Sequence, residues 1–440
     1  MSGVASGSPG LKGYAVIAGV VLIILATTGV WNPFPKLWSW INTSDPIAAG
    51  AAQWQVTLGG SPQSITLAGG AAIVEYRTSV EAYGIGAGVK LWKSDADWAS
   101  VAGDEPDSVV VTGRLLTKGY QVLDPRSGVA LRTDTTATAV WTYTNGVLDL
   151  HCAKGDDCEL TAWDPRGSRP LWTVPAPSLG FKLNADNPDL PDTQPLTATR
   201  VNAHVAGPAP LPALIGLPDD GKVRIVDTAR GKAVQTVTPA GNERVAVAGG
   251  RVLTVTGDAR DGTCYYGVVA RVAAGPVTWS RDGLNLRTAD NGSSCKQDRD
   301  PVGGRDVILG VDPIGRQELL AAHDGRVLWH GDKGQKVLAV DDANAVIRSA
   351  DGRTLTGRSF TGGSGWRRSV STNAQAALTP WAAVITDSKP ARVTVLNPAN
   401  GSILTEVKTD ATAFVAGPGA MILVSGRDMA YLPFGVSTAR

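Results

Sequence analysis

The sequence predicts an all-β fold built from many short strands. Its 440 residues include 52 glycines and 27 prolines, scattered among runs rich in valine and threonine, without long amphipathic helical patterns. Such runs, interrupted by turn residues, are typical of short strands joined by tight turns. A spaced pattern also recurs along the chain at intervals near 40 residues. This recurrence indicates that one small sheet is repeated.

Composition limits the partners that the chain can have. The 41 basic and 40 acidic residues give a net charge of +1 and are spread along the chain without a basic block. A nucleic acid is therefore not an expected partner. The length and the 43% hydrophobic content are sufficient for a large core.

The N-terminal segment is expected to anchor the chain in a membrane. Residues 14–31 carry no charge and are just numerous enough to cross a bilayer as one helix. Aromatic residues typical of the headgroup layer follow at Trp31, Phe34, Trp38 and Trp40. We expect a short cytoplasmic tail over 1–13, a transmembrane helix over 14–31 and an aromatic juxtamembrane linker over 32–49. A cleaved signal peptide is the alternative, although a good cleavage site is missing.

The four cysteines favour two disulfides. Cys152 and Cys158 flank a Gly-Asp-Asp turn between two strand-like runs, where a disulfide would join the two sides of a hairpin. A bond between Cys264 and Cys295 would tether a long polar loop. Disulfides indicate an oxidising compartment, so we expect the N-terminus inside and the main domain on the extracytoplasmic side. The alternatives are four reduced cysteines, or a zinc site that combines His151 with thiols, although no Cys-x-x-Cys pair is present.

The repeated pattern is a frame of three positions. A turn position, often Asp or Asn, is followed four residues later by a glycine position and four residues after that by a tryptophan position. Five instances are Asp124/Gly128/Arg132, Asp164/Ser168/Trp172, Asp227/Gly231/Gln235, Arg358/Gly362/Trp366 and Asn397/Gly401/Thr405. Three more match the last two positions, namely Gly88/Trp92, Gly275/Trp279 and Gly325/Trp329. The tryptophan positions are separated by 40, 40, 63, 44, 50, 37 and 39 residues, which is typical of a β-propeller or another repeat array.

Each position of the frame has a physical role in a hairpin. An Asp or Asn side chain can cap the turn by accepting a hydrogen bond from the backbone two residues on. Glycine can supply the positive φ that a short hairpin needs. A tryptophan that recurs once per sheet is expected to pack between neighbouring sheets. Asp164 and Trp172 are therefore interpreted as a turn cap and a wedge, rather than as catalytic residues.

The frame resembles the repeat of the quinoprotein-type (PQQ-like) β-propeller family, Ala-x-Asp-x-x-Thr-Gly-x-x-x-Trp. Thr361, Gly362 and Trp366 match its second half, and Asp124 and Gly128 match its Asp and Gly positions. WD40 propellers also require Gly-His pairs, and this sequence has none. The resemblance covers about residues 50–440 and implies a ring of about eight four-stranded blades.

The two ends of the chain are expected to share one blade. The C-terminal region offers three apolar strand-like runs but then stops without the Gly-x-x-x-Trp strand, and Gly50–Trp54 supplies that missing piece. Such sharing closes a propeller and removes its free edges. Eight frames and one shared unit add up to nine, so we expect one unit to be incomplete if the ring has about eight blades.

The resemblance does not extend to the family's quinone chemistry. Quinoprotein dehydrogenases hold the quinone beside a disulfide of adjacent cysteines, and this sequence lacks a Cys-Cys pair and a haem-binding Cys-x-x-Cys-His motif. Motifs of nucleophilic hydrolases, zinc proteases, P-loops and calcium loops are also missing. We therefore expect no cofactor, no metal and no enzymatic activity. The chain is similar instead to non-enzymatic members, such as the propeller lipoprotein of the outer-membrane β-barrel assembly machine.

The sequence thus predicts a membrane-anchored scaffold that binds a protein of the cell envelope or membrane. Two intervals between frames are long, and insertions of this kind often carry function. The segment 175–198 is acidic and proline-rich, lacks the glycine turn of a calcium loop and is interpreted as an extended, solvated loop. The segment 280–304, which a Cys264–Cys295 bond would tether, is the preferred candidate for binding a partner. The alternatives are a propeller that binds or senses a small molecule or a glycan, and, less favoured, a quinone-dependent oxidoreductase.

Overall fold

The computed structural model describes residue 47 and residues 52–176, 210–286 and 306–435, apart from positions 116, 155, 156, 262, 364, 380 and 418. They belong to the unit Ile47–Arg440. The expected cytoplasmic tail and transmembrane helix lie outside the described residues, as does all of the expected linker except Ile47. Within the described part of the chain, no helix combines the length and the hydropathy that crossing a bilayer requires.

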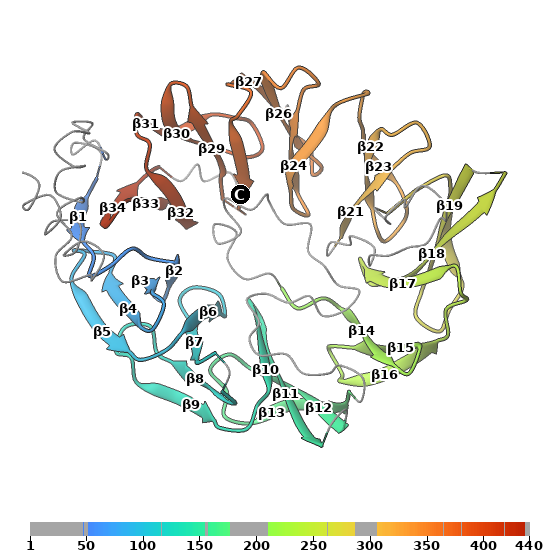
Figure 1. Ribbon diagram of the computed structural model, residues 1–440, viewed down its shortest axis with the longest axis horizontal. Helices are drawn as coiled ribbons and strands as arrows, with labels where there is room; N and C mark the ends of the chain where they lie inside the picture. The colour runs from blue at the N-terminus through green and yellow to red at the C-terminus, as the bar shows by residue number, and fades with distance from the viewer. Residues whose placement is uncertain are drawn as a thin grey trace, which may run out of the picture. The chain divides into compact units, whose positions relative to one another are not determined.

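The described strands form nine antiparallel sheets, which we number as blades 1–9 in chain order (Figure 1). Blade 1 contains β2 (Ser64–Ala68), β3 (Ala71–Glu75), β4 (Val80–Gly84) and β5 (Lys90–Ser94). Blade 2 contains β6 (Trp98–Ala102), β7 (Val109–Gly113), β8 (Tyr120–Leu123) and β9 (Ala130–Asp134). Blade 3 contains β10 (Ala139–Tyr143), β11 (Gly146–Lys154), β12 (Asp157–Trp163) and β13 (Pro170–Pro175).

The next three blades include the two sheets in which three strands are described. Blade 4 contains β14 (Leu214–Asp219), β15 (Lys222–Asp227) and β16 (Lys232–Val237). Blade 5 contains β17 (Glu243–Ala248), β18 (Arg251–Arg260), β19 (Thr263–Arg271) and β20 (Val277–Asp282). Blade 6 contains β21 (Val307–Val311), β22 (Gln317–Ala321) and β23 (Val327–His330).

The last three blades have four strands each. Blade 7 contains β24 (Lys336–Val340), β25 (Asn344–Arg348), β26 (Thr354–Ser359) and β27 (Trp366–Ser369). Blade 8 contains β28 (Gln375–Leu378), β29 (Ala383–Ser388), β30 (Ala391–Leu396) and β31 (Ile403–Val407). Blade 9 contains β32 (Thr412–Gly417), β33 (Ala420–Ser425), β34 (Asp428–Pro433) and β1 (Trp54–Thr57).

The prediction of about eight blades is wrong, because the described residues form nine. Every frame of the sequence lies in its own blade, between the last two strands, and the shared blade is complete. The frame count of nine was therefore the better guide than the blade number implied by the resemblance. Three strands are described in each of blades 4 and 6, and in blade 6 an isolated bridge also joins Asn285 to Val311 of β21.

The prediction that the two ends of the chain share a blade is confirmed. β1 pairs antiparallel with β34, with Trp54 opposite Tyr431 and Thr57 opposite Asp428. The Trp54 and Tyr431 rings stack with their centroids 5.5 Å apart. Just beyond this pair, the Arg427 guanidinium donates hydrogen bonds to the Leu58 carbonyl. Backbone pairing, ring stacking and a charged hydrogen bond therefore all hold the shared blade together.

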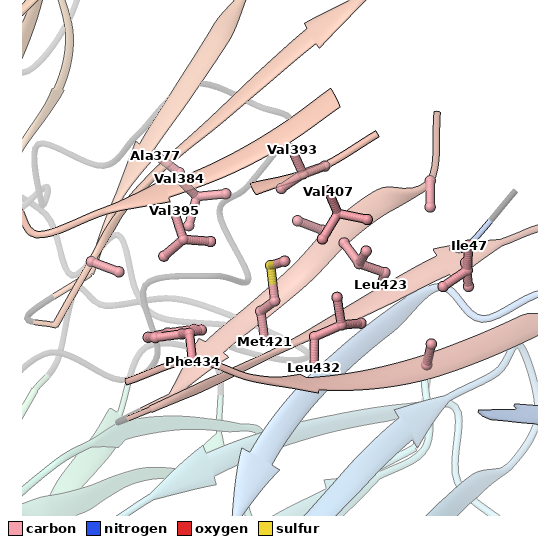
Figure 2. Close-up of a cluster of buried hydrophobic side chains, with 14 residues drawn as sticks. Ile47, Ala377, Val384, Val393, Val395, Val407, Met421, Leu423, Leu432 and Phe434 are labelled. Atoms are coloured by element: carbon pink, nitrogen blue, oxygen red, sulfur yellow. The ribbon is translucent and has the colours of Figure 1, made fainter. Parts of the chain in front are cut away.

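The nine blades close into a ring through their buried side chains. Nine clusters of buried apolar residues are present in the described chain, and each one joins two consecutive blades, including blade 9 with blade 1. Figure 2 shows the cluster between blades 8 and 9, where Val395 and Val407 face Met421 and Leu423. Innermost strands such as β6 are buried along their whole length, whereas outer strands such as β9 are largely exposed. The core is therefore a ring of interfaces between sheets.

Candidate functional site

The two long loops between frames lie almost entirely outside the described residues. Of the segment 175–198 only residues 175 and 176 are described, and of 280–304 only residues 280–286. The calcium and partner interpretations of these loops lie outside the described residues. Within the described residues, the candidate positions are those of the frame, the charged residues between blades and the exposed residues of the outer strands.

The tryptophan of each docked blade lies on the turn of the next blade. The indole Nε1 donates to the carbonyl of Ile85 from Trp54 (2.6 Å), Pro125 from Trp92 (2.8 Å), Thr228 from Trp172 (2.7 Å), Ala322 from Trp279 (2.8 Å) and Pro398 from Trp366 (3.1 Å). The glycine of the receiving turn lies flat against the ring. A Cβ atom on Gly88, Gly128, Gly231, Gly325 or Gly401 would lie 2.2–2.7 Å from atoms of that tryptophan. The frame glycine therefore has two roles: it forms the turn of its own blade, and it leaves room for the tryptophan of the preceding blade.

Where the tryptophan position holds another residue, the contact changes in a way that fits the receiving turn. Arg132 donates from Nη1 to the Gly167 carbonyl of blade 3 at 2.7 Å. Gln235 accepts from the Ala274 backbone N–H of blade 5 at 2.8 Å. Thr405 faces blade 9, whose last two strands come from opposite ends of the chain, so no turn is available to receive a tryptophan. Trp329 differs from the five docked tryptophans, because it is buried in the apolar cluster between blades 6 and 7 and does not cover Gly362, the frame glycine of blade 7.

The turn positions act through their side-chain oxygens. Oδ1 of Asp124, Asp164, Asp227 and Asn397 each accepts a hydrogen bond from the backbone N–H two residues on. Burial raises the pKa of Asp124, but hydrogen bonds from Ser127, Arg126 and Arg166 together hold it below its usual value. Gly362 adopts a φ of +100°, whereas at Gly275 the positive φ belongs to the preceding Ala274. The capping residues of the frame are therefore engaged in local structure.

The residue two places after the tryptophan position faces the next blade and is charged in three blades. Arg281 of blade 5 donates to Glu318 of blade 6 at 2.7 Å. Arg368 of blade 7 pairs with Glu406 of blade 8. Asp134 of blade 2 lies 3.6 Å from His151 Nε2 of blade 3. Alternate residues of a strand point to the same face, so the frame itself places these charges between blades.

Within the described residues, two groups combine acidic side chains with a histidine. Asp134, Asp149 and His151 lie between blades 2 and 3, and Asp312, Glu318 and His330 lie on blade 6. The carboxylates of Asp149 and Glu318 are buried. The pKa of His151 is raised, chiefly by the neighbouring Asp149 carboxylate and against the effect of burial. Sequence reasoning missed both groups, although the two-residue step after the tryptophan position would have pointed to Asp134.

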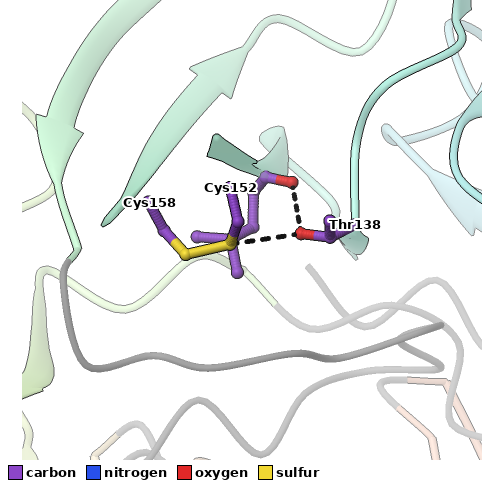
Figure 3. Close-up of a disulfide and its surroundings, with 4 residues drawn as sticks. Thr138, Cys152 and Cys158 are labelled. Atoms are coloured by element: carbon purple, nitrogen blue, oxygen red, sulfur yellow. Dashed lines mark hydrogen bonds between the residues drawn. A yellow bond between two sulfur atoms is a disulfide. The ribbon is translucent and has the colours of Figure 1, made fainter. Parts of the chain in front are cut away.

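The predicted disulfide between Cys152 and Cys158 is confirmed. The two residues lie opposite each other on β11 and β12, with Cα atoms 4.0 Å apart. Figure 3 shows the Thr138 hydroxyl donating to the Leu150 carbonyl and to Cys152 Sγ. Because these two sulfurs are bonded to each other, they cannot join His151 in a zinc site. Cys264 lies on β19, and its expected partner Cys295 lies outside the described residues, so that pairing stays a prediction.

Apolar side chains are exposed in register on the outer strands of three successive blades. Leu91, Leu131 and Leu171 each directly precede the tryptophan position of blades 1, 2 and 3, and are 43%, 38% and 60% exposed. Two residues earlier, Val89 and Val129 are about as exposed as Leu171. We call these five residues the outer strip. Exposed apolar side chains that recur on several strands can contribute to an interaction surface.

No protein-family model matches the sequence, and no curated protein matches it either. BamB from Moraxella catarrhalis is 17% identical over 87% of this chain and 99% of its own, with a TM-score of 0.39. The computationally designed Ika8 protein is 12% identical over 86% of this chain and 98% of its own, with a TM-score of 0.38.

An enzyme is among the similar structures as well. Quinohemoprotein alcohol dehydrogenase from Comamonas testosteroni is 12% identical over 87% of this chain and 76% of its own, with a TM-score of 0.38. At these identities and TM-scores the similarities carry no conclusion about function.

The docking of Trp172 on Gly231 can be tested with a matched pair of glycines in blade 4. Gly231 and Gly221 have φ values of +60° and +72°. A Cβ atom on Gly231 would lie 2.2 Å from Trp172, whereas a Cβ atom on Gly221 would have no neighbour within 4 Å. Gly221→Ala should therefore cost roughly 1–2 kcal/mol for the backbone conformation alone. Gly231→Ala should cost roughly 1–3 kcal/mol more because the indole must move. Urea unfolding midpoints of the two variants measure the difference, and equal midpoints would argue against docking.

The charge pair between blades 7 and 8 predicts a dependence of stability on pH. Burial raises the pKa of Glu406, but a hydrogen bond from Thr394 and the charges of Arg368 and Arg392 together hold it below its usual value. A depressed pKa stabilises the fold above the unfolded-state value of about 4.3 and ceases to do so as pH falls through the lower folded-state value. The stability lost by Glu406→Gln should therefore be larger at pH 7 than at pH 3. Asp410→Asn, an exposed control in the next loop, should show less change with pH.

Proposed function

We propose that the protein is a membrane-anchored, PQQ-like β-propeller without a quinone, which acts on the extracytoplasmic side as a scaffold for a protein of the cell envelope. The outer strip is the observation that carries this proposal. The repeated tryptophans, glycines and turn residues form contacts within and between blades, which supports a structural role for the frame. The outer strip, by contrast, presents apolar side chains to solvent.

The chemistry of the outer strip favours a protein partner. Leu91, Leu131 and Leu171 occupy the same register position on three outer strands, so they recur along the rim at the spacing of the blades. Burying one leucine against a partner contributes roughly 1.5–3 kcal/mol. Lys93, two residues from Leu91 on the same strand, is charged and half-exposed, which suits the polar surroundings of an interface.

Two further observations support the membrane and the compartment. Residues 14–31 form an uncharged stretch of the length of a membrane span. The disulfide between Cys152 and Cys158 is typical of proteins exposed to oxidising conditions. Together they favour a propeller held at the outer face of a membrane.

Site-specific photo-cross-linking of the full-length protein in its own membrane tests the proposal. A photoreactive amino acid at position 91, 131 or 171 should give one common adduct. The control is position 314, because Ile314 is 67% exposed but belongs to blade 6. In addition, Leu131→Glu should reduce the adduct formed from position 171 severalfold. Adducts of equal yield at position 314, or none from the three leucine positions, would contradict the scaffold role of this surface.

A further inference from the structure

His151, Asp149 and Asp134 bring three ligand atoms together between blades 2 and 3. His151 Nε2 lies 3.3 Å from Asp149 Oδ2 and 3.6 Å from Asp134 Oδ2. Asp149 and His151 come from β11, and Asp134 from the end of β9. Asp149 is fully buried, and its second oxygen, Oδ1, has no hydrogen-bond partner among the described residues. The Asp149 carboxylate therefore carries its negative charge in a buried place, with Oδ2 toward His151 and Oδ1 unpartnered, which is costly unless a cation neutralises it.

The surroundings hold each of these three side chains in place. The Thr136 hydroxyl lies 3.1 Å from His151 Nδ1. If Nδ1–H donates to that hydroxyl, the lone pair of Nε2 points toward the two carboxylates. Asp149 Oδ2 accepts hydrogen bonds from Tyr120 (2.7 Å) and Trp163 (2.9 Å). Such outer partners of histidine and carboxylate are the usual support of metal ligands.

A neutral imidazole nitrogen facing two carboxylates needs a cation between them, either a proton or a metal ion. A proton on Nε2 would form charge-assisted hydrogen bonds of about 2.7–2.9 Å. Both separations from Nε2 are longer than that. Bonds of about 2.0–2.1 Å to a tetrahedral zinc ion place its ligand atoms roughly 3.3–3.4 Å apart. The observed separations of 3.3 and 3.6 Å lie close to this spacing.

The other acidic group that contains histidine shows the contrast. Glu318 accepts from Arg281 at 2.7 Å and lies 2.8 Å from His330 Nδ1, both ordinary hydrogen-bond distances. Asp312 accepts from the Arg316 guanidinium at 2.7 Å. Arginines therefore supply the positive charge on blade 6. Between blades 2 and 3, the nearby Arg132 directs Nη1 to the Gly167 carbonyl instead.

We propose that Asp134, Asp149 and His151 bind a divalent transition-metal ion, with Zn²⁺ as the best match, and that this ion links blade 2 to blade 3. One nitrogen and two carboxylate oxygens balance the charge of the ion and leave a fourth position for water or for a group from a partner. The His151 side chain is 30% exposed, which gives the ion a path from solvent. The role is structural, because the site joins strands of two blades.

Zinc binding by the full-length protein tests this proposal. After removal of metal with EDTA, equilibrium dialysis against ZnCl₂ should show one tightly bound ion per chain. His151→Gln and Asp134→Asn should each weaken binding at least tenfold, since removing even an outer-shell partner costs about 10–100-fold. Zinc should also raise the thermal midpoint of the wild type but not of these variants. The matched controls His330→Gln and His323→Gln should bind as the wild type does.

Several results would overturn the site. They are the lack of a bound ion, binding that is unchanged in both His151→Gln and Asp134→Asn, or an equal loss in His330→Gln. If either variant fails to fold, as judged by circular dichroism, X-ray absorption of the zinc-loaded wild type decides the matter. A shell of nitrogen and oxygen atoms with one imidazole is expected, and a sulfur shell or two imidazoles would refute the assignment.

Discussion

The docking of an aromatic ring from one blade on the turn of the next is the interaction on which the ring depends. The indole of Trp172 covers Gly231 and donates to the Thr228 carbonyl, so one side chain provides both apolar contact and a directional bond. Truncating a buried tryptophan generally costs roughly 3–5 kcal/mol, and the contact recurs at five blade interfaces of the described chain. Because each blade fixes its neighbour, the outer faces of the blades remain free to bind other molecules.

Closure explains why blade 8 has no docking contact with blade 9. A ring of identical hairpins would have a turn for every tryptophan, but the shared blade joins β34 to a strand from the other end of the chain. Thr405 faces this blade, and a tryptophan there would find no turn to receive it. Trp54, on the strand supplied by the N-terminal end, docks on Gly88 of blade 1 and so restores the series. The threonine at position 405 therefore coincides with the seam of the ring.

The spacing of the frame is sufficient to predict the repeat and the shared blade, and the positions of Cys152 and Cys158 on either side of a turn are sufficient to predict the hairpin disulfide. These features depend on residues near one another in sequence or on a regular period. The predicted blade number is wrong because the resemblance implies about eight blades, whereas the eight frames and the shared unit add up to nine. The cluster around His151 could not be predicted, since it depends on how β9 of one blade lies against β11 of the next. Arg132 and Gln235 show that docking can persist without tryptophan, which a pattern based on residue type does not detect.

The claim that the ring is closed by the two ends of the chain has a direct test. Thr57 and Asp428 lie opposite each other in the β1–β34 pair, and their side chains are hydrogen-bonded at 2.7 Å. In the double variant Thr57→Cys/Asp428→Cys, mild oxidation should form a cross-link that joins positions 371 residues apart. Non-reducing gels would show it as a large mobility change that neither single-cysteine variant displays. Failure of the folded double variant to cross-link would contradict closure by these strands.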